Sequence, residues 1–183
     1  MLIGLAGRAG SGKDTVSAHL ARKYDFSTLA LATPIKDGLI AMFGILGVTR
    51  ESFEHPAKEA VIRGLTVSPR VLAQTLGTEW GRTRISSDIW IQHAHVRMRQ
   101  IMRYSQRIVV TDVRFPNEAK WIHDNGGRVW HLRRSLPSNV SSLHASEAGL
   151  PVQAWAGDEI LDNNAGLDQL YAVVDRAYEA ARG

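Results

Sequence analysis

Short apolar runs alternate along this chain with longer stretches in which apolar residues recur every three or four positions. The short runs predict buried strands, and the longer stretches predict helices with one apolar face. Strands separated by helices are typical of an α/β fold, here a three-layer arrangement with a central, mainly parallel sheet flanked by helices. The five expected strands cover residues 2–6, 27–31, 107–112, 128–132 and 159–162.

The helices are marked by their ends as well as by their apolar faces. Thr33 and Pro34 predict the start of a helix, as an N-cap and a first helical residue. The other expected helices cover residues 12–24, about 69–80, 88–102, 117–127 and from about 167 onward. In the helix expected at 88–102, the inward side chains are Ile91, Ala94, Met98 and Ile101. In the helix expected from about residue 167, they are Leu170, Tyr171, Val174 and Tyr178.

The remaining segments carry weaker patterns. Residues 45–67 are expected to be irregular, and the Ser-rich residues 135–146 are the best candidate for a mobile loop. Three large aromatic side chains are expected in the core: Trp90, Trp121 and Trp130.

Composition sets broad limits. The 183 residues suit a single domain, and 44% hydrophobic with 22% charged residues is ordinary for a globular protein. The absence of Cys excludes disulfide frameworks and Cys-based zinc or thiol chemistry. No apolar run approaches the roughly 20 residues of a membrane span, and no basic leader opens the chain. We therefore expect a cytoplasmic protein without membrane contact.

The net charge of +4 raises the question of a polyanionic partner. A net positive charge can indicate nucleic acid binding, but the basic residues here are scattered along the sequence and form no cluster. A phosphorylated small substrate explains the same bias, so nucleic acid is not the expected partner.

Residues 7–15, GRAGSGKDT, match a phosphate-binding loop at most positions. Gly7, Gly12 and Lys13 have the Walker A spacing between a strand and a helix, and Gly10 adds flexibility. Backbone N–H groups of such a loop converge on phosphate oxygens, and Lys13 reaches the β- and γ-phosphates. A glycine-rich turn without a ligand is the alternative.

Asp14 departs from this motif, which has Ser or Thr after the Lys. There a hydroxyl ligates Mg²⁺. A carboxylate is a stronger Mg²⁺ ligand but repels phosphate, so the metal or a water must lie between them. Alternatively, Asp14 only offsets the helix dipole in the first turn.

Asp112 ends a predicted buried strand, at the edge where open α/β sheets bind ligands. This is the Walker B position, whose Asp holds Mg²⁺ directly or through water. No Glu follows it and no Asn-Lys-x-Asp motif is present, which counts against motor ATPases and GTPase switches. Arg114 is expected to clamp the transferring phosphoryl group. Alternatively it pairs with Glu118, although Asn117 and Glu118 are expected to cap the next helix.

A second set of polar residues suggests an acceptor site. Arg70, Gln74, Gly77 and Gly81 share one α-helical face, which suits a flat base or sugar, with Gln74 at the base edge. Alternatively, Gly77 is a C-cap that ends the helix. Three side chains, Leu72, Leu76 and Trp80, point in other directions, towards a core.

Two more residues have competing roles. Lys36 in a first helical turn opposes the dipole unless a phosphate binds there, and otherwise is a solvated surface Lys. Asp88 is best explained as the N-cap of the long helix, and alternatively meets a sugar hydroxyl.

Arg133, Arg134 and His144 flank the Ser-rich loop. Kinases that act on small molecules must exclude water, and a short basic lid serves this purpose. A solvated loop with surface arginines is the alternative.

Together these stretches resemble the bacteriophage deoxynucleoside monophosphate kinases. The matching pieces, in family order over roughly residues 4–147, are GRAGSGKDT, LATPIKD, LAQTLGTEWGR with SDIW, VVTDVRFPNEA, GGRVWHLRR and HASE. Gly-Lys-Asp-Thr in the loop is itself a feature of that family. The resemblance implies a P-loop kinase fold and Mg-ATP-dependent phosphorylation of a deoxynucleoside monophosphate (dNMP), in the host cytoplasm if a phage encodes it. It also favours a homodimer.

The resemblance assigns residues to sites within one domain, residues 1–183. It implies an acceptor-binding helical region at about 33–105 and a lid-like loop at about 133–147. The ATP-binding residues it implies are Gly7, Ala9, Gly10, Ser11, Gly12, Lys13, Asp14 and Thr15. For Mg²⁺ it implies Asp14 and Asp112. The implied dNMP-binding residues are Lys36, Arg70, Gln74, Trp80, Asp88 and Arg114, and the lid residues are Arg133, Arg134 and His144. The implied catalytic residues are Lys13, Arg114, Arg133 and Arg134.

Two other functions stay open at this point. One is another small-molecule P-loop kinase, such as a dephospho-coenzyme A kinase-like protein. The other is a P-loop module that binds ATP and nucleic acid without catalysis, which predicts steeply salt-dependent DNA binding and no ADP release with dNMPs.

Overall fold

The computed structural model describes residues 1–135 and 150–182. The chain divides into two compact units, one of Met1–Ala30 with Ala94–Gly183 and one of Leu31–His93. Within the described ranges, no helix is long and apolar enough to cross a membrane.

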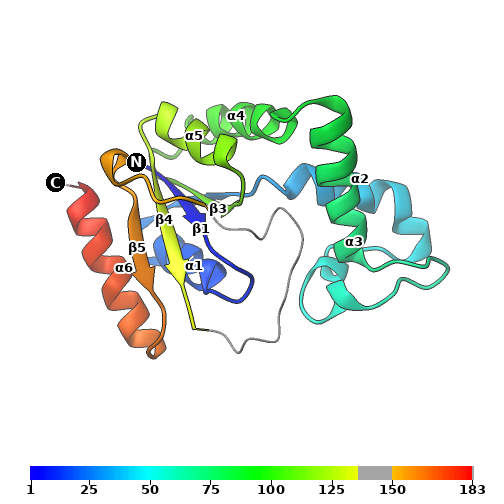
Figure 1. Ribbon diagram of the computed structural model, residues 1–183, viewed down its shortest axis with the longest axis horizontal. Helices are drawn as coiled ribbons and strands as arrows, with labels where there is room; N and C mark the ends of the chain where they lie inside the picture. Colours follow the sequence, from blue (N-terminus) through cyan, green and yellow to red (C-terminus); the bar gives the residue numbers. More distant parts are fainter. Residues whose placement is uncertain (136–149, 183) are drawn as a thin grey trace. The chain divides into compact units, whose positions relative to one another are not determined.

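The first unit is built on a sheet of five parallel strands, as the sequence predicts (Figure 1). Its spatial order is β2-β3-β1-β4-β5. The strands are β1 (Leu2–Ala6), β2 (Ser27–Leu29), β3 (Ile108–Val113), β4 (Arg128–Arg133) and β5 (Glu159–Asp162). Because β1 lies in the middle, the loop that follows it leaves the carboxyl edge at the centre of the sheet.

Helices cover both faces of this sheet because β1 is apolar on both sides. Ile3 and Leu5 point to one face, in a buried cluster with α1 (Lys13–Tyr24) and α6 (Leu167–Arg182). Gly4 points to the other face, where it meets α5 (Pro116–Asp124). A Cβ on Gly4 would lie 2.3 Å from the side chain of Ile122, so glycine allows this helix to approach closely.

A polar cluster joins α1 to α6. The carboxylate of Asp175 accepts hydrogen bonds from His19 Nε2 at 2.7 Å, Lys23 Nζ at 2.7 Å and Tyr24 Oη at 2.8 Å. The His19 ring also stacks on Tyr171, with ring centroids 4.2 Å apart. Burial acts to raise the pKa of Asp175, but these three donors outweigh it and lower the pKa to about 2.

The second unit is helical and has its own core. It contains α2 (Thr33–Phe43), α3 (Pro69–Gln74), the start of α4 (Ile89–Ile101) and three short 3₁₀ turns, η1 (Gly44–Leu46), η2 (Glu51–Phe53) and η3 (Ala57–Glu59). Turns η2 and η3 fall in the segment expected to be irregular, residues 45–67, and η1 begins one residue before it. The buried side chains of this core are Ile35, Leu39, Val48, Phe53 and Trp90.

Most of the predicted elements are confirmed, with two differences at helix ends. The residue before α2 is Ala32, which has no side-chain cap, so the predicted N-cap Thr33 is instead the first helical residue. After α3 the chain continues as a π-helix, η4 (Thr75–Ile85), where an α-helix was expected. The predicted inward stripe of α4 and the predicted core residues Trp90, Trp121 and Trp130 are buried.

Candidate active site

The loop between β1 and α1 has the backbone of a phosphate cradle. Gly7, Gly10 and Gly12 have φ angles of +147°, +76° and +102°, which residues other than glycine rarely adopt. The loop follows the central strand, and α1 begins at Lys13, so the positive end of a helix dipole faces the loop. The predicted strand–loop–helix arrangement is therefore present.

The carbonyl groups of this loop are bonded to protein donors. Lys13 Nζ donates to the carbonyls of Gly7 at 2.7 Å and Arg8 at 3.0 Å. The Ser11 carbonyl accepts from Asn163 Nδ2 at 2.9 Å. Carbonyl oxygens repel anions, so holding them on protein donors favours an anion on the N–H side of the loop.

Ser11 brings a hydroxyl into the same loop. The residue is 2% exposed, and its Oγ has no hydrogen-bond partner in the part of the chain that the structure describes. A Cβ on Gly7 would lie 2.6 Å from this oxygen and 2.6 Å from the Leu132 carbonyl. A buried hydroxyl without a partner is costly, and a ligand oxygen would satisfy it.

The two expected metal ligands lie in the first unit. Asp14 stands exposed in the first turn of α1, a position that both of its proposed roles require. Asp112 is half-buried near the end of β3, and the next residue, Val113, pairs with Ala6 directly before the cradle. Among the described residues, no group of three or more His, Cys, Asp and Glu could hold a metal alone. Mg²⁺ with one or two carboxylates needs no such group when phosphate and water complete its shell.

Arg114 follows β3 directly and is exposed. Its backbone N–H and that of Phe115 donate to the carboxylate of Glu118, at 2.7 Å and 3.0 Å. Glu118 is 3% exposed, and it satisfies N–H groups at the start of α5. The expectation that Glu118 caps this helix is confirmed.

A pocket of about 450 Å³ lies beside the cradle, within the first unit. Arg133 and Arg134, from the end of β4, line it, and Arg134 also reaches the Gly10 carbonyl at 3.5 Å. The third expected lid residue, His144, lies outside the described residues. The remaining lining residues are Ala6, Gly7, Arg8, Ser11, His131, Leu132, Ser135, Leu150, Val152, Asp162 and Asn164.

The polar residues at the end of β5 were not expected from the sequence to belong to the site. Asp162 and Asn164 line the pocket, and Asn163 bonds the cradle. Asp162 is the last residue of this short strand, and Asn163 and Asn164 follow it directly, at the carboxyl edge where ligands bind. The same strand-end rule that pointed to Asp112 would therefore have found them.

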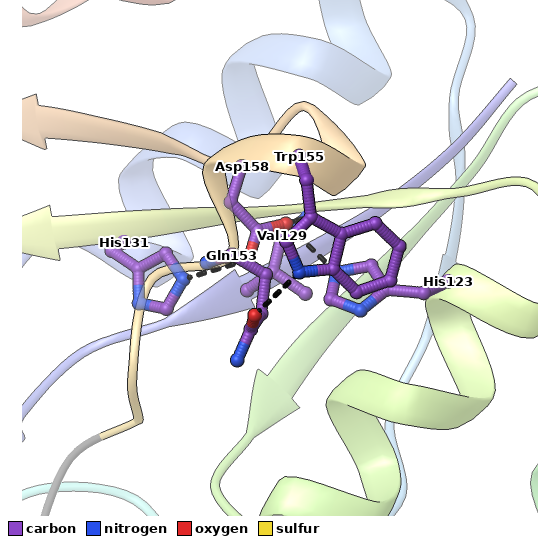
Figure 2. A network of polar contacts seen from close by, with 6 residues as sticks. All are labelled: His123, Val129, His131, Gln153, Trp155 and Asp158. Carbon is purple, nitrogen blue, oxygen red and sulfur yellow. Dashed lines mark hydrogen bonds and ion pairs between the residues drawn. The ribbon is translucent and has the colours of Figure 1, made fainter.

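A buried polar network supports the wall of this pocket (Figure 2). Asp158 accepts hydrogen bonds from His123 Nε2 at 2.8 Å, the Val129 N–H at 2.7 Å and the Gln153 N–H at 2.9 Å, and His131 Nε2 lies 3.4 Å away. Burial acts to raise the pKa of Asp158, but these backbone N–H groups and the His123 ring outweigh it and lower the pKa. Burial lowers the pKa of His131. The network joins β4, α5 and the segment that precedes β5.

Two of the acceptor residues predicted in the second unit, Lys36 and Arg70, contact acidic side chains of the protein. Lys36 lies 3.6 Å from Glu54, and its ammonium lies 5.9 Å from the centre of the Phe53 ring. Arg70 donates to Glu59 from Nε at 2.8 Å and from Nη2 at 2.5 Å.

The expected helical face of Arg70, Gln74, Gly77 and Gly81 does not form. A π-helix has a different repeat from an α-helix, so η4 turns its glycines inward. Gly77 and Gly81 are buried, and a Cβ on them would meet Ile35 at 2.9 Å and Trp90 at 2.5 Å. Gly77 is therefore neither a bare patch for a base nor a C-cap.

The last two acceptor candidates lie at the surface of the second unit. Trp80 is 49% exposed, not directed into a core as expected. Asp88 directly precedes α4, and its carbonyl accepts from the Gln92 N–H at 2.9 Å, which is the N-cap position.

Known proteins resemble this chain over most of its length. Residues 48–174, more than half of the chain, match the family described as deoxynucleotide monophosphate kinase. A protein of Acanthamoeba polyphaga mimivirus, provisionally named a deoxynucleotide monophosphate kinase, is 30% identical, over 95% of this chain and 94% of its own. The deoxynucleoside-5′-monophosphate kinase of Escherichia phage T5 is 26% identical, over 93% of this chain and 92% of its own.

Dephospho-CoA kinases are also similar. That of Symbiobacterium thermophilum is 28% identical, over 100% of this chain and 82% of its own. The structure of the Campylobacter jejuni dephospho-CoA kinase has a TM-score of 0.50 at 12% identity, over 98% of this chain and 96% of its own, which shows a shared fold. The family match and the two viral relatives confirm the predicted family. This chain belongs to the deoxynucleotide monophosphate kinase family, a family of phosphotransferases.

Proposed function

We propose that this protein transfers the γ-phosphoryl group of ATP to a dNMP, giving a dNDP and ADP. The observation that carries the proposal is the loop of Gly7 to Gly12, with three positive φ angles and carbonyls held by Lys13 and Asn163. Such a loop suits a chain of phosphates, and it occurs here in a member of a dNMP kinase family.

In this proposal the triphosphate lies on the backbone N–H groups of Ala9 to Thr15 other than that of Ser11, which donates to the Arg8 carbonyl at 3.1 Å. Lys13 neutralises charge on the β- and γ-phosphates, and Ser11 Oγ donates to a phosphate oxygen. The nucleoside of ATP occupies the neighbouring pocket, where Leu132, Leu150 and Val152 offer apolar surface.

Mg²⁺ fits the residues present. Asp14 and Asp112 would hold it, directly or through water, and phosphate oxygens would complete its shell. When bound, Mg²⁺ offsets the negative charge that builds up during phosphoryl transfer.

The side chains act mainly by position and charge. We assign Arg114, Arg133 and Arg134 to the transferring group, where guanidinium groups spread positive charge over its oxygens. The acceptor phosphate is already anionic near neutral pH, so no residue is assigned as a general base. The acceptor itself is assigned to five residues of the second unit: Lys36, Arg70, Gln74, Trp80 and Asp88.

The test is ADP release from Mg-ATP with each dNMP, each NMP and dephospho-coenzyme A. We expect turnover with one or more dNMPs and its loss in Lys13→Ala. Lys120→Ala is the matched control, because Lys120 pairs with Asp124 on the surface of α5. Turnover with dephospho-coenzyme A alone would favour that kinase class instead.

A result without ADP release from any acceptor would contradict the proposal. ATP binding combined with steeply salt-dependent DNA binding would then favour the non-catalytic module. The family resemblance also favours a homodimer, and light scattering of the purified protein measures whether it forms.

A further inference from the structure

Asn163 stands directly after β5 and is 8% exposed. Its side-chain Nδ2 donates to the Ser11 carbonyl at 2.9 Å, and its backbone N–H donates to the Arg133 carbonyl at 2.7 Å. Asn163 therefore connects two segments that are distant in sequence, the cradle and the end of β4.

The cradle and Asn163 also fit each other in shape. A Cβ on Gly12 would lie 2.5 Å from Asn163 Nδ2, and the φ of Gly12 is +102°. Glycine at this position thus does more than permit the turn. It leaves the space that the amide group of Asn163 occupies.

The hydrogen bond to Ser11 also fixes the next N–H group. In a trans peptide the carbonyl of one residue and the N–H of the next point in opposite directions. Asn163 holds the Ser11 carbonyl in the protein interior, so the Gly12 N–H points the opposite way. That N–H belongs to the set that meets phosphate in the proposed function.

We propose that Asn163 is a positioning residue for the phosphate cradle, acting through the Ser11–Gly12 peptide group. The inference rests on the proposed function, because it takes the loop to be the ATP site. The neighbouring residue has a separate task, since Asn164 Oδ1 accepts from the Ser135 N–H at 2.7 Å. Asn163 holds the cradle, and Asn164 holds the chain that follows Arg133 and Arg134.

Two variants test the role of the amide donor. Asn163→Ala removes it and leaves the Ser11 carbonyl unpaired, whereas Asn163→Asp keeps the shape and replaces the donor by an acceptor. We expect each to weaken ATP binding roughly tenfold or more. The Michaelis constant for the dNMP should stay unchanged, because the peptide group faces the donor nucleotide.

Asn125→Ala is the matched control. Asn125 also donates its amide to a backbone carbonyl, that of Trp121 at 2.8 Å, but at the end of α5. It should lower the melting temperature without changing the affinity for ATP. If Asn163 had only this structural role, its variants would behave in the same way.

Inorganic tripolyphosphate separates the cradle from the nucleoside. We expect the Asn163 variants to lose affinity for tripolyphosphate and for ATP by the same factor, at one fixed Mg²⁺ concentration and below their melting temperatures. A loss of affinity for ATP but not for tripolyphosphate would overturn the inference in favour of a nucleoside contact. Unchanged ATP affinity in Asn163→Asp would overturn it outright. If the unaltered protein binds neither compound, it is the proposed function that fails.

Discussion

Trp90 donates its indole N–H to the backbone carbonyl of Gly77 at 2.7 Å, inside the core of the Leu31–His93 unit. The same ring packs against Gly81, where a Cβ would lie 2.5 Å from its Cζ2 atom. Because the ring is buried and bonded, it cannot easily move away. The two glycines of TLGTEWGR therefore serve packing.

This contact predicts that Gly81→Ala destabilises the protein by about 1–3 kcal/mol through overpacking. Gly38→Ala is the control, because among the described residues a Cβ there meets only Leu76, at 3.8 Å, and alanine is the better helix former. Gly38→Ala should be neutral or stabilising. Urea unfolding of both variants measures the difference, and equal stabilities would contradict this account of Gly81.

Gly12→Ala should weaken ATP binding at least tenfold, because the new Cβ is strained and displaces the amide of Asn163. Gly126→Ala separates strain from crowding. Gly126 also has a positive φ, of +72°, but no atom of the described residues lies within 4 Å of its Cβ position. We expect Gly126→Ala to lose stability and keep its ATP affinity, as measured by titration calorimetry.

The low pKa of Asp175 in the folded protein makes stability depend on pH. Its pKa is about 2 in the folded protein and 3.8 as the ordinary value, so the unfolded chain takes up the proton first as pH falls. The stabilisation is complete above the ordinary pKa and is lost as pH falls towards 2. Asp175→Asn should therefore cost about 1–2 kcal/mol at pH 7 and progressively less below about pH 4.

Asp124→Asn is the control for Asp175. Its carboxylate pairs with Lys120 on an exposed helix face, a contact worth only about 0.3–0.5 kcal/mol. Urea unfolding at pH 7 and at pH 3 measures both variants. A pH-independent effect of Asp175→Asn would show that the charge of this residue is not what joins α1 to α6.

His131 should make stability fall on mild acidification. Burial lowers its pKa in the folded protein, so below the ordinary value of 6.5 the unfolded chain binds a proton that the folded protein resists. This loss of stability is absent well above pH 6.5 and grows as pH falls below 6.5. The melting temperature of His131→Gln should change less between pH 7.5 and pH 6 than that of the unaltered protein, and an equal change would exclude His131 as the source.

Arg70→Ala tests the acceptor assignment. If Arg70 meets the dNMP, the variant should raise the Michaelis constant for dNMP about tenfold and leave that for ATP unchanged. Arg50→Ala is the control, because Arg50 makes a similar pair with Asp37 in the same unit. Equal effects of the two variants on dNMP would remove Arg70 from the acceptor site.

The sequence by itself determined the parallel sheet, because strands such as LIGLA are buried on both faces and carry apolar residues throughout. It also determined the cradle, since Gly7, Gly12 and Lys13 act at fixed spacing within one short segment. Local patterns of this kind depend on neighbours along the chain, so they can be read without the fold.

Only the tertiary structure decided features that depend on distant segments. Asn163 reaches Ser11 across 152 positions, and no local pattern specifies that hydrogen bond. An α-helical repeat predicts a ligand face at Gly77 and Gly81, whereas Trp90 packs against them along a π-helix. Packing between elements selects such backbone geometry, because burying a large ring outweighs the small preference for a regular α-helix.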